Sequence, residues 1–499
     1  MTSVLPRREA DDWSRIATQD IKVGKDIIEL LSSGMYVSPV TIYREYVQNA
    51  ADAIDAAREQ ALIGPRSRGE VSISFDHAAR SVTIRDNGAG LKKRNVISTL
   101  LAIGASSKRG TGARGFRGVG RLSGLAYCKE LEFRTKAAGE DDVSIVRWSS
   151  RAMRECLRDA AFHGNLEQVL AQAVTVRHEK APKTSEHFFE VRLNDISRLR
   201  NDVLLNEQLI GNYLSEVAPL PFSPDFSFGP EIDKTLSLHR TSIPLNLTVA
   251  NEVIVRPYRD EIVFPSTSQA LHVKGIEFVE FPDVDGRAGA VAWIADHEYI
   301  RSIPPSLGVS GIRARSGDLQ VGENNLFEDV FKERRFNGWS IGEIHVLDQR
   351  IVPNGRRDNF EVNHHYYNLL VQLGPLAAKI AHRCRTSSVA RNNGVSADKA
   401  IQAIEDRLKQ RQRFDPAELS RLKSTLLRAE THVKRLEDET QAKPLLKKID
   451  RLKRRLTDLT PKRGASAVAL DEAASLIAKI VTNREQARKL LTALQRLCQ

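Results

Sequence analysis

A helix-like segment near residue 50 carries the first side chains that suit catalysis. Its sequence, Glu45-Tyr-Val-Gln-Asn49-Ala-Ala-Asp52, spaces three polar residues by four and three, so all three share one face of an α-helix. A carboxylate one helical turn from a carboxamide can hold a water molecule and a metal ion next to each other. Glu45 would accept a proton from that water, and the amide oxygen of Asn49 would be a magnesium ligand. Taken alone, the pattern also fits a solvated stripe on a surface helix.

A second group of residues follows a strand that ends in a glycine turn. The segment Val82-Thr-Ile-Arg-Asp86-Asn-Gly88-Ala-Gly90-Leu91 alternates in period 2 up to Asp86 and then turns. Gly88 and Gly90 permit positive φ or a close backbone approach, which leaves the Asp86 carboxylate exposed at the strand end. A carboxylate there can accept a hydrogen bond from an exocyclic amine and so select adenine over guanine. A simple Asp-Asn-Gly turn fits the same residues.

A third, glycine-rich segment, Gly115-Phe-Arg-Gly118-Val119-Gly120, precedes an apolar helical run. Glycines before a helix leave backbone N–H groups free to face phosphate oxygens. The spacing matches neither the P-loop nor the dinucleotide-binding fingerprint. Residues 105–115 just upstream are basic and glycine-rich, which suits a lid over phosphates. A mobile loop with a helix cap remains an equal interpretation.

Alternating helices and strands must position these segments. Helical periodicity covers residues 27–54, and period-2 patterns predict strands at Val71–Phe75, Ser81–Arg85, Leu131–Thr135, Ser144–Trp148 and Phe188–Leu193. We expect an α+β chain: an α/β sandwich, then a mixed α/β domain, then an all-helical coiled coil or hairpin. The expected parts are an N-terminal tail (1–19), a nucleotide domain with a helical insertion near 150–187 (20–235), a middle domain (236–390), a linker (391–400) and a basic helical region (401–499).

Composition excludes several classes of protein. The 499 residues are 41% hydrophobic and 28% charged, which is ordinary for globular chains. Four scattered cysteines form neither a disulfide framework nor a metal-binding pair, and no stretch reads as a signal peptide or a membrane span. A cytoplasmic protein is therefore expected. Residues 401–499 contain 23 Lys and Arg against 13 Asp and Glu, which fits either solvated helices or an acidic or nucleic-acid partner.

Together, in this order and spacing, the three motifs resemble the GHKL superfamily of ATPases, which includes gyrase, heat-shock protein 90, histidine kinases and MutL. The resemblance covers about residues 25–195. It implies the Bergerat nucleotide fold, with ATP and Mg²⁺ between a helical layer and a lid. Histidine kinases need an upstream phosphoacceptor helix, and the residues before the domain contain no histidine.

The resemblance implies a role for each motif residue. Glu45 is similar to the general base, Asn49 to the magnesium ligand and Asp86 to the adenine-reading aspartate. Thr135 resembles the threonine that holds water beside adenine. Lys108 in the lid corresponds least directly to a family residue, and its implied role is to contact phosphate. The remaining nucleotide-binding positions are Asp52, Gly88, Gly90, Leu91, Gly115, Gly118, Val119 and Gly120.

A segment of the middle region points to the heat-shock protein 90-like branch. Ile351-Val-Pro-Asn354-Gly-Arg356-Arg357-Asp-Asn-Phe360 is similar to the chaperone segment in which an arginine reaches the ATP γ-phosphate. Arg357 is the expected finger, with Arg356 close behind. A guanidinium from another domain can stabilise charge on the phosphoryl oxygens and couple docking to hydrolysis. A basic surface turn would carry the same residues.

These expectations describe a divergent ATP-operated clamp. A homodimer with a protein client or a dedicated partner is implied by the resemblance, and no membrane partner is expected. The last hundred residues do not resemble the chaperone dimerisation domain, which leaves a general chaperone role open. Two alternatives stand beside it: a nucleic-acid-associated clamp resembling MutL or the MORC ATPases, and a scaffold that binds ATP without turnover.

Overall fold

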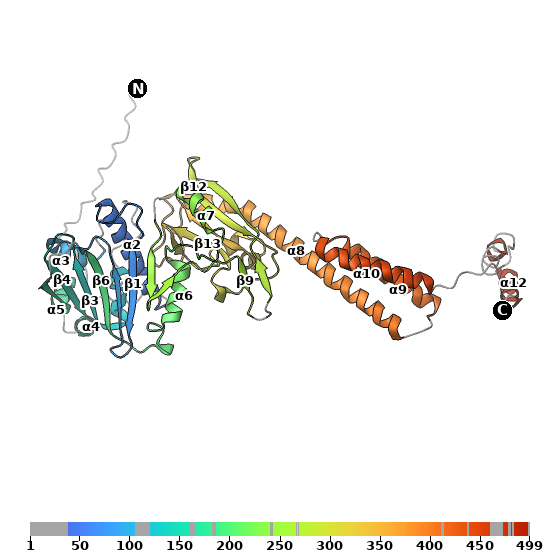
Figure 1. Cartoon of the computed structure of the whole chain (residues 1–499), viewed down its shortest axis with the longest axis horizontal. Coiled ribbons are helices and arrows are strands. Elements are labelled where there is room, and N and C mark those ends of the chain that lie inside the picture. Colours follow the sequence, from blue (N-terminus) through green and yellow to red (C-terminus); the bar gives the residue numbers. More distant parts are fainter. Residues whose placement is uncertain are drawn as a thin grey trace, which may run out of the picture. The chain divides into compact units, whose positions relative to one another are not determined.

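The computed structural model describes most of the chain in two compact units. The described residues are 38–104, 120–159, 165–181, 186–239, 243–265, 267, 269–410, 414–436, 439–459, 473–477, 481 and 484–497. The first unit is Met1–Cys384 and the second is Arg385–Gln499. The fold is mixed α+β, as expected, with an eight-stranded sheet, a second mixed sheet and C-terminal helices (Figure 1).

The first sheet has the order β5-β4-β3-β6-β2-β1-β7-β8. Neighbouring strands are antiparallel except β1 and β7, which are parallel. The strands are β1 (Glu70–Asp76), β2 (Ser81–Asp86), β3 (Cys128–Lys136), β4 (Asp142–Ser149), β5 (Val174–Lys180), β6 (Phe188–Ile196), β7 (Asn246–Val249) and β8 (Glu252–Ile254). β7 and β8 lie beyond the boundary expected at residue 235, so the first sheet draws on sequence that was assigned to the middle domain.

Helix α2 (Thr41–Glu59) carries the first motif. It contains neither Gly nor Pro, and its apolar residues recur at helical spacing on one face. Ile42, Val47 and Ile54 are fully buried in the same core as Val82 and Ile84 of β2. Each such side chain contributes roughly 1.5–3 kcal/mol when it leaves water, which fixes the polar face of α2 relative to the end of β2.

Smaller elements complete this region of the first unit. They are η2 (Lys93–Asn95), α3 (Val96–Leu100), η3 (Gly120–Ala126), α4 (Ser150–Arg158), α5 (Leu166–Ala173), η4 (Arg200–Asp202) and α6 (Glu207–Val217). The insertion expected near 150–187 is therefore only partly helical, because β5 follows α5 directly. Ser149 caps α4, and Asn165 forms a capping box with Gln168 on α5.

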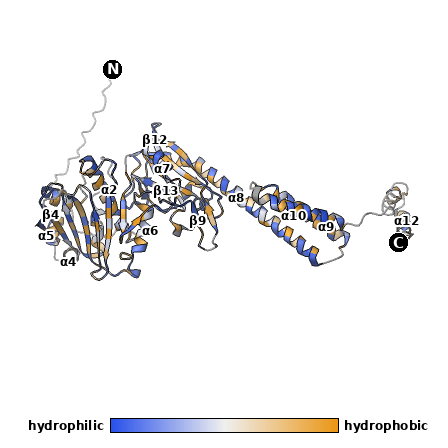
Figure 2. Cartoon of the chain, viewed as in Figure 1, coloured by the Kyte–Doolittle hydropathy of each residue, from blue (hydrophilic) through white to orange (hydrophobic). Residues whose placement is uncertain are grey.

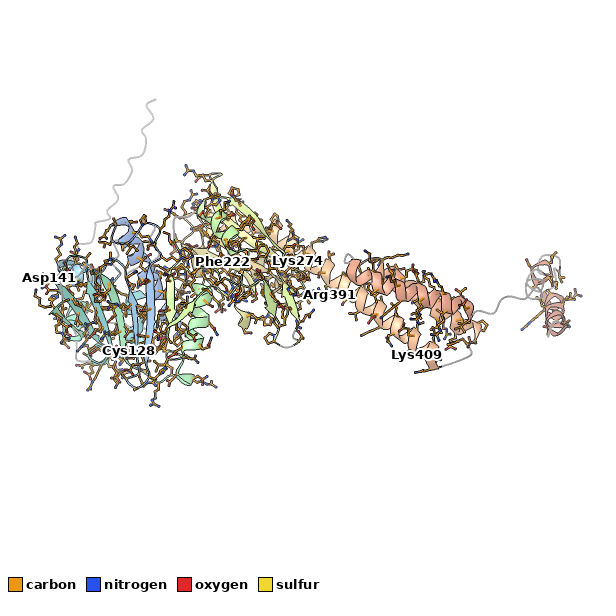
Figure 3. All side chains as sticks on the ribbon, in the orientation of Figure 1. Cys128, Asp141, Phe222, Lys274, Arg391 and Lys409 are labelled. Carbon is orange, nitrogen blue, oxygen red and sulfur yellow. The ribbon has the colours of Figure 1, made fainter. Side chains whose placement is uncertain are left out.

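The second sheet, ordered β11-β12-β15-β13-β14, has a core on each face. One core packs against the first part of α8, and the other contains a cluster of aromatic rings around Phe222 and Trp293 (Figure 3 labels Phe222). The elements are α7 (Gly229–Ser237), β9 (Glu261–Val263), β10 (Ala270–His272), β11 (Gly275–Pro282), β12 (Ala288–Asp296), η5 (Pro305–Leu307), β13 (Gly311–Ser316), β14 (Leu319–Val321), η6 (Glu328–Val330), η7 (Arg334–Trp339), β15 (Ile341–Val346) and α8 (His364–Gln410).

The linker expected at 391–400 is instead part of α8. Its Asn-Asn-Gly sequence favours a turn. However, Ala397, Ile401 and Ile404 are almost completely buried in the core of the second unit, and that packing outweighs the local preference. Figure 3 labels Arg391, the first residue of this stretch, and Lys409 near the end of α8.

The second unit is helical. α9 (Pro416–Val433) and α10 (Glu439–Asp458) pack on each other and on α8 through the predicted leucine-rich seams, and α12 (Arg484–Leu497) follows. Asp415 caps α9 by accepting a hydrogen bond from the N–H of Glu418 at 2.7 Å. None of the helices that the structure describes combines the length and the apolar character needed to cross a membrane.

Candidate functional site

The polar face of α2 carries Glu45, Asn49 and Asp52. Glu45 and Asp52 are each 7% exposed, and Asn49 is half-buried. Burying a carboxylate costs free energy unless a partner compensates its charge, so the groups around Glu45 and Asp52 are described next. The structure brings this helix together with the end of β2, with Gly120 and with Arg357.

Gly120 makes a close contact with the Glu45 carboxylate. A β-carbon added at Gly120 would lie 2.3 Å from Glu45 Oε2, so only glycine fits there without displacing the carboxylate. Tyr46 holds η3 in place: its hydroxyl accepts from the N–H of Gly124 at 3.0 Å and lies 3.3 Å from the carbonyl of Arg121. The third motif thus begins η3 directly against α2.

Four residues expected in the lid and phosphate turn lie outside the described residues. They are Lys108, Gly115, Gly118 and Val119. On the described side, the Arg121 guanidinium donates to the carbonyl of Ala102 and so joins the two ends of this segment. Burial lowers the pKa of Arg121.

The end of β2 meets α2 through backbone contacts. Asp86 is 6% exposed, and its Oδ1 accepts from the N–H of Gly88 at 2.8 Å. The N–H of Ala89 donates to the carbonyl of Ala53 at 3.0 Å. A β-carbon at Gly88 would lie 2.6 Å from that of Ala53, so the glycine permits the contact between the two motifs.

Gly90 and Thr135 build the backbone beside Asp86. Gly90 has φ +63°, and a β-carbon there would lie 2.1 Å from the carbonyl oxygen of Lys136. The Thr135 hydroxyl donates to the carbonyl of Phe188 at 3.0 Å and accepts from the N–H of Leu91 at 2.9 Å. Thr135 therefore holds Leu91 against β3 and β6, and its expected place beside adenine stays a prediction.

His187 is a residue of this region that the motifs did not indicate. Its Nδ1 lies 2.7 Å from the carbonyl oxygen of Gly88. Because a carbonyl only accepts, Nδ1 carries the proton of this hydrogen bond. His187 lies two residues before Phe189, which pairs with Asp86 across β2 and β6. The pairing register of β2 and β6 would have placed His187 near the turn after Asp86. The spacing of residues within each motif does not indicate it.

Arg357 follows the last strand of the second sheet in the sequence, and its side chain lies close to Glu45. Its Nε lies 3.8 Å from Glu45 Oε1, and the side chain is buried. Arg357 has φ +57°, an uncommon conformation for a bulky residue. Two hydrogen bonds hold it: its N–H donates to the carbonyl of Asn354 at 3.1 Å, and its carbonyl accepts from Gly322 at 2.8 Å. Backbone strain of this kind is typical of functional sites.

Arg44 is a second cation at Glu45 and was not identified from the sequence. One guanidinium nitrogen lies 3.7 Å from Glu45 Oε1 and donates to the carbonyl of Arg356 at 3.0 Å. The backbone of Arg356 and the side chain of Arg357 thus both contact the α2 face. Of the two candidate fingers, Arg357 is the one whose guanidinium is recorded at the Glu45 carboxylate.

A buried ion cluster ties the second sheet to the chain that leaves α6. Glu343 lies 2.7 Å from Arg256, 2.6 Å from Arg315 and 2.9 Å from the Tyr258 hydroxyl. Burial alone would raise the pKa of Glu343, but the two guanidiniums outweigh it and hold that pKa well below its usual range. The carboxylate is therefore charged and fully paired.

The same arginines bind backbone carbonyls in the last turn of α6 and in the segment that follows it. Arg315 donates to the carbonyl of Glu216 at 2.8 Å and to that of Ala218 at 3.3 Å, and Arg256 donates to Leu220 at 2.8 Å. The last carbonyls of a helix have no partner within it, so Arg315 satisfies that of Glu216 in the final turn of α6. The cluster fixes the first sheet to the second and thereby sets where the Arg357 segment meets α2.

Replacing Glu343 with glutamine should lower the free energy of unfolding by about 3–5 kcal/mol, because two buried guanidiniums lose their counter-charge. Urea denaturation of the full chain measures it, with the exposed Glu323→Gln as the matched control. The pKa of Glu343 is depressed in the folded state. Its contribution to the free energy of unfolding is therefore full above the pKa of an unfolded glutamate, about 4.3, and declines as the pH falls below that value. An unfolding midpoint equal to that of the wild type would contradict the role given to this cluster.

Comparison with known proteins identifies the first region. Residues 37–161 match the family model described as histidine kinase-, DNA gyrase B-, and HSP90-like ATPase. This part of the chain is a GHKL-type ATPase domain. Such a domain implies ATP binding, typically with magnesium, and it contains α2, the end of β2 and Gly120.

The GHKL domain also has curated relatives. Chaperone protein HtpG from Escherichia coli O1:K1, from strain E24377A and from strain HS is 32% identical over 143 residues. The match covers 25% of this chain and 23% of each relative, so the chain spans about a quarter of the length of the curated relatives it matches. The expected distant likeness to heat-shock protein 90 is confirmed over this part.

Proposed function

We propose that this chain is an ATP-hydrolysing conformational clamp. The observation that carries the proposal is the approach of Arg357 to Glu45, at 3.8 Å, across 312 residues of sequence. The Arg357 guanidinium comes from a segment that follows the second sheet in sequence. It can lie beside Glu45 only when the first and second sheets are held together. Hydrolysis would then be coupled to the arrangement of the domains.

Each residue near α2 has a role in the proposal. Glu45 orients and deprotonates the attacking water, since it is the buried carboxylate next to the Gly120 backbone. Asp86 reads the exocyclic amine of adenine. Arg357 stabilises negative charge on the transferred phosphoryl group, where a planar guanidinium can form two hydrogen bonds.

The donor set around Asn49 fits magnesium. Mg²⁺ prefers hard oxygen ligands and is usually bound through one or two protein side chains together with substrate phosphates. The half-buried Asn49 amide, one turn from Glu45, supplies such an oxygen. When bound, the ion would neutralise the charge of the phosphates. Asp52, one further turn along the same face, would support the base-binding end of the pocket.

The biological role proposed here is chaperone-like. The matched relatives are chaperones by name, which supports remodelling of a protein client or a dedicated partner by a homodimer in the cytoplasm. Turnover is expected to be slow, because lid and domain motions rather than chemistry set the rate in clamps of this kind. A nucleic-acid-associated clamp is the second candidate, and the charge of α10 favours it.

Replacing Arg357 with alanine tests the proposal. We expect ATP turnover by the full chain to fall at least about tenfold, while the dissociation constant for ATP stays within about threefold. Phosphate release under saturating ATP and magnesium measures the first, and nucleotide titration measures the second. Arg356→Ala is the matched control, because the contact of Arg356 with Arg44 uses only its backbone carbonyl. Equal turnover by the two variants would refute the assignment of Arg357.

A further inference from the structure

Helix α10 carries a row of exposed basic residues that the ATPase site does not use. Lys443, Lys447, Arg451 and Arg454 follow one another at spacings of four, four and three, so they share one face of the helix. Lys448 and Arg455 are also exposed and flank this row. These six residues are called the basic stripe below.

The stripe faces outward because the opposite face of α10 is buried. Ile449, Leu452 and Leu456 are at most 3% exposed and pack against α8 and α9. Lys453, which lies between the two faces, is paired with Glu430 on α9 at 2.7 Å. Figure 2 shows hydrophilic residues along α10.

Basic residues far outnumber acids on this helix. Between residues 441 and 458, α10 has seven Lys and Arg against two acids, Asp450 and Asp458. Within the part of the chain that the structure describes, no ion pair is recorded for Lys447, Lys448, Arg451 or Arg454. Cations close together on one face repel one another, so an anionic partner would relieve the repulsion.

We propose that the basic stripe binds the phosphate backbone of duplex DNA without reading its sequence. The row from Lys443 to Arg454 is about 16 Å long at the rise of an α-helix. Duplex DNA places one phosphate per about 3.4 Å on each strand, so the stripe can face roughly five phosphates of a strand. The stripe contains no aromatic side chain that could stack on bases and no Asn or Gln that could read adenine.

Other anionic partners fit less well. A helix that binds a membrane surface inserts an apolar face, and the apolar face of α10 is already buried in the bundle. Anchor residues of protein interfaces are most often Trp, Tyr and Arg, and the stripe offers arginines but no aromatic anchor. The inference deepens the second candidate function, the nucleic-acid-associated clamp, and does not depend on the proposed ATPase activity.

Fluorescence anisotropy of the full chain with a labelled duplex of about 20 base pairs tests the proposal. Binding should weaken with salt, and a plot of log K against log salt should have a slope of about −4 to −5, since four to six phosphates are contacted. Duplexes rich in A·T and in G·C should bind equally. The stripe variant combines Lys447→Gln, Lys448→Gln, Arg451→Gln and Arg454→Gln.

This variant should bind at least about tenfold more weakly at ~100 mM salt, with a slope reduced by about 3–4. The matched control removes two lysines and two arginines that are exposed on the first unit: Arg66→Gln, Lys234→Gln, Arg287→Gln and Lys332→Gln. It has the same net charge and should bind like the wild type. ATP turnover, measured on both variants, should be unchanged, which separates this result from the proposed function.

Three results would overturn the inference. They are the absence of duplex binding by the wild type at ~50 mM salt, equal binding by the two quadruple variants, and stronger association with vesicles rich in phosphatidylserine than with DNA. If the stripe variant loses helical content, a charge-preserving variant replaces it, with Lys447→Arg, Lys448→Arg, Arg451→Lys and Arg454→Lys. That variant must retain the affinity and the salt slope, and loss of either would also overturn the inference.

Discussion

Replacing Glu45 with alanine is expected to lower the rate of ATP hydrolysis by about 10²–10⁴-fold while ATP binding is kept. Glu45 is a buried carboxylate that lies against the Gly120 backbone and 3.8 Å from Arg357. Without it, the carboxylate assigned to remove the proton from the attacking water is missing. Adenine recognition at Asp86 does not involve this carboxylate, so binding survives.

Two companion variants sharpen the Glu45 experiment. Glu45→Gln keeps the shape of the side chain beside Gly120 and removes only the charge, so it should lose turnover as Glu45→Ala does. Glu59→Ala alters an exposed glutamate at the end of the same helix and should leave turnover unchanged. Normal hydrolysis by either Glu45 variant would show that the mechanism is assigned wrongly.

Replacing Asp86 with asparagine is expected to abolish ATP binding. In the proposal, one oxygen of this carboxylate receives the exocyclic amine of adenine, while Oδ1 accepts from the N–H of Gly88 at 2.8 Å. An amide of the same shape presents a donor where an acceptor is needed. The unmatched buried donor and the lost charge-assisted hydrogen bond both oppose binding.

Nucleotide titration by calorimetry measures the Asp86 effect. Asp76→Asn makes the same change at an exposed position at the end of β1 and serves as the control. A dissociation constant for ATP within about threefold of the wild-type value would show that Asp86 does not read the base.

Local signals in the sequence were sufficient for the elements of the nucleotide domain. The spacing of Glu45, Asn49 and Asp52 predicted one helix face, and the glycines after Asp86 predicted a turn. Both are found, in α2 and at the end of β2. Such signals depend on a few neighbouring residues, and burial of Ile42 and Ile54 against β2 then fixes the contact between the two motifs.

Long-range pairing was beyond the same reasoning. β7 lies parallel to β1, from which it is separated by 170 residues of sequence. The four residues of β7 do not indicate which strand it pairs with. The turn-like sequence 391–400 is helical because distant leucines and isoleucines cover it. In both cases tertiary packing decides, and packing is not encoded in a local window.

Buried charges were the other feature that residue types alone did not reveal. Glu343 and Arg315 alternate with apolar residues and look like the solvent face of a strand, yet both are almost fully buried. Arg44 likewise has the composition of a surface residue and is only 6% exposed. Their partners come from other elements, so pairing becomes visible only when the sheets are assembled.

ATP binding and phosphate release, measured on one sample of the full chain with and without magnesium, test the central claim most directly. The account predicts that the chain binds ATP and releases phosphate slowly with magnesium, and that chelation of the ion stops release. Binding without phosphate release in the presence of magnesium would mean that the site is a scaffold and that the paired Glu45 and Arg357 do not catalyse hydrolysis.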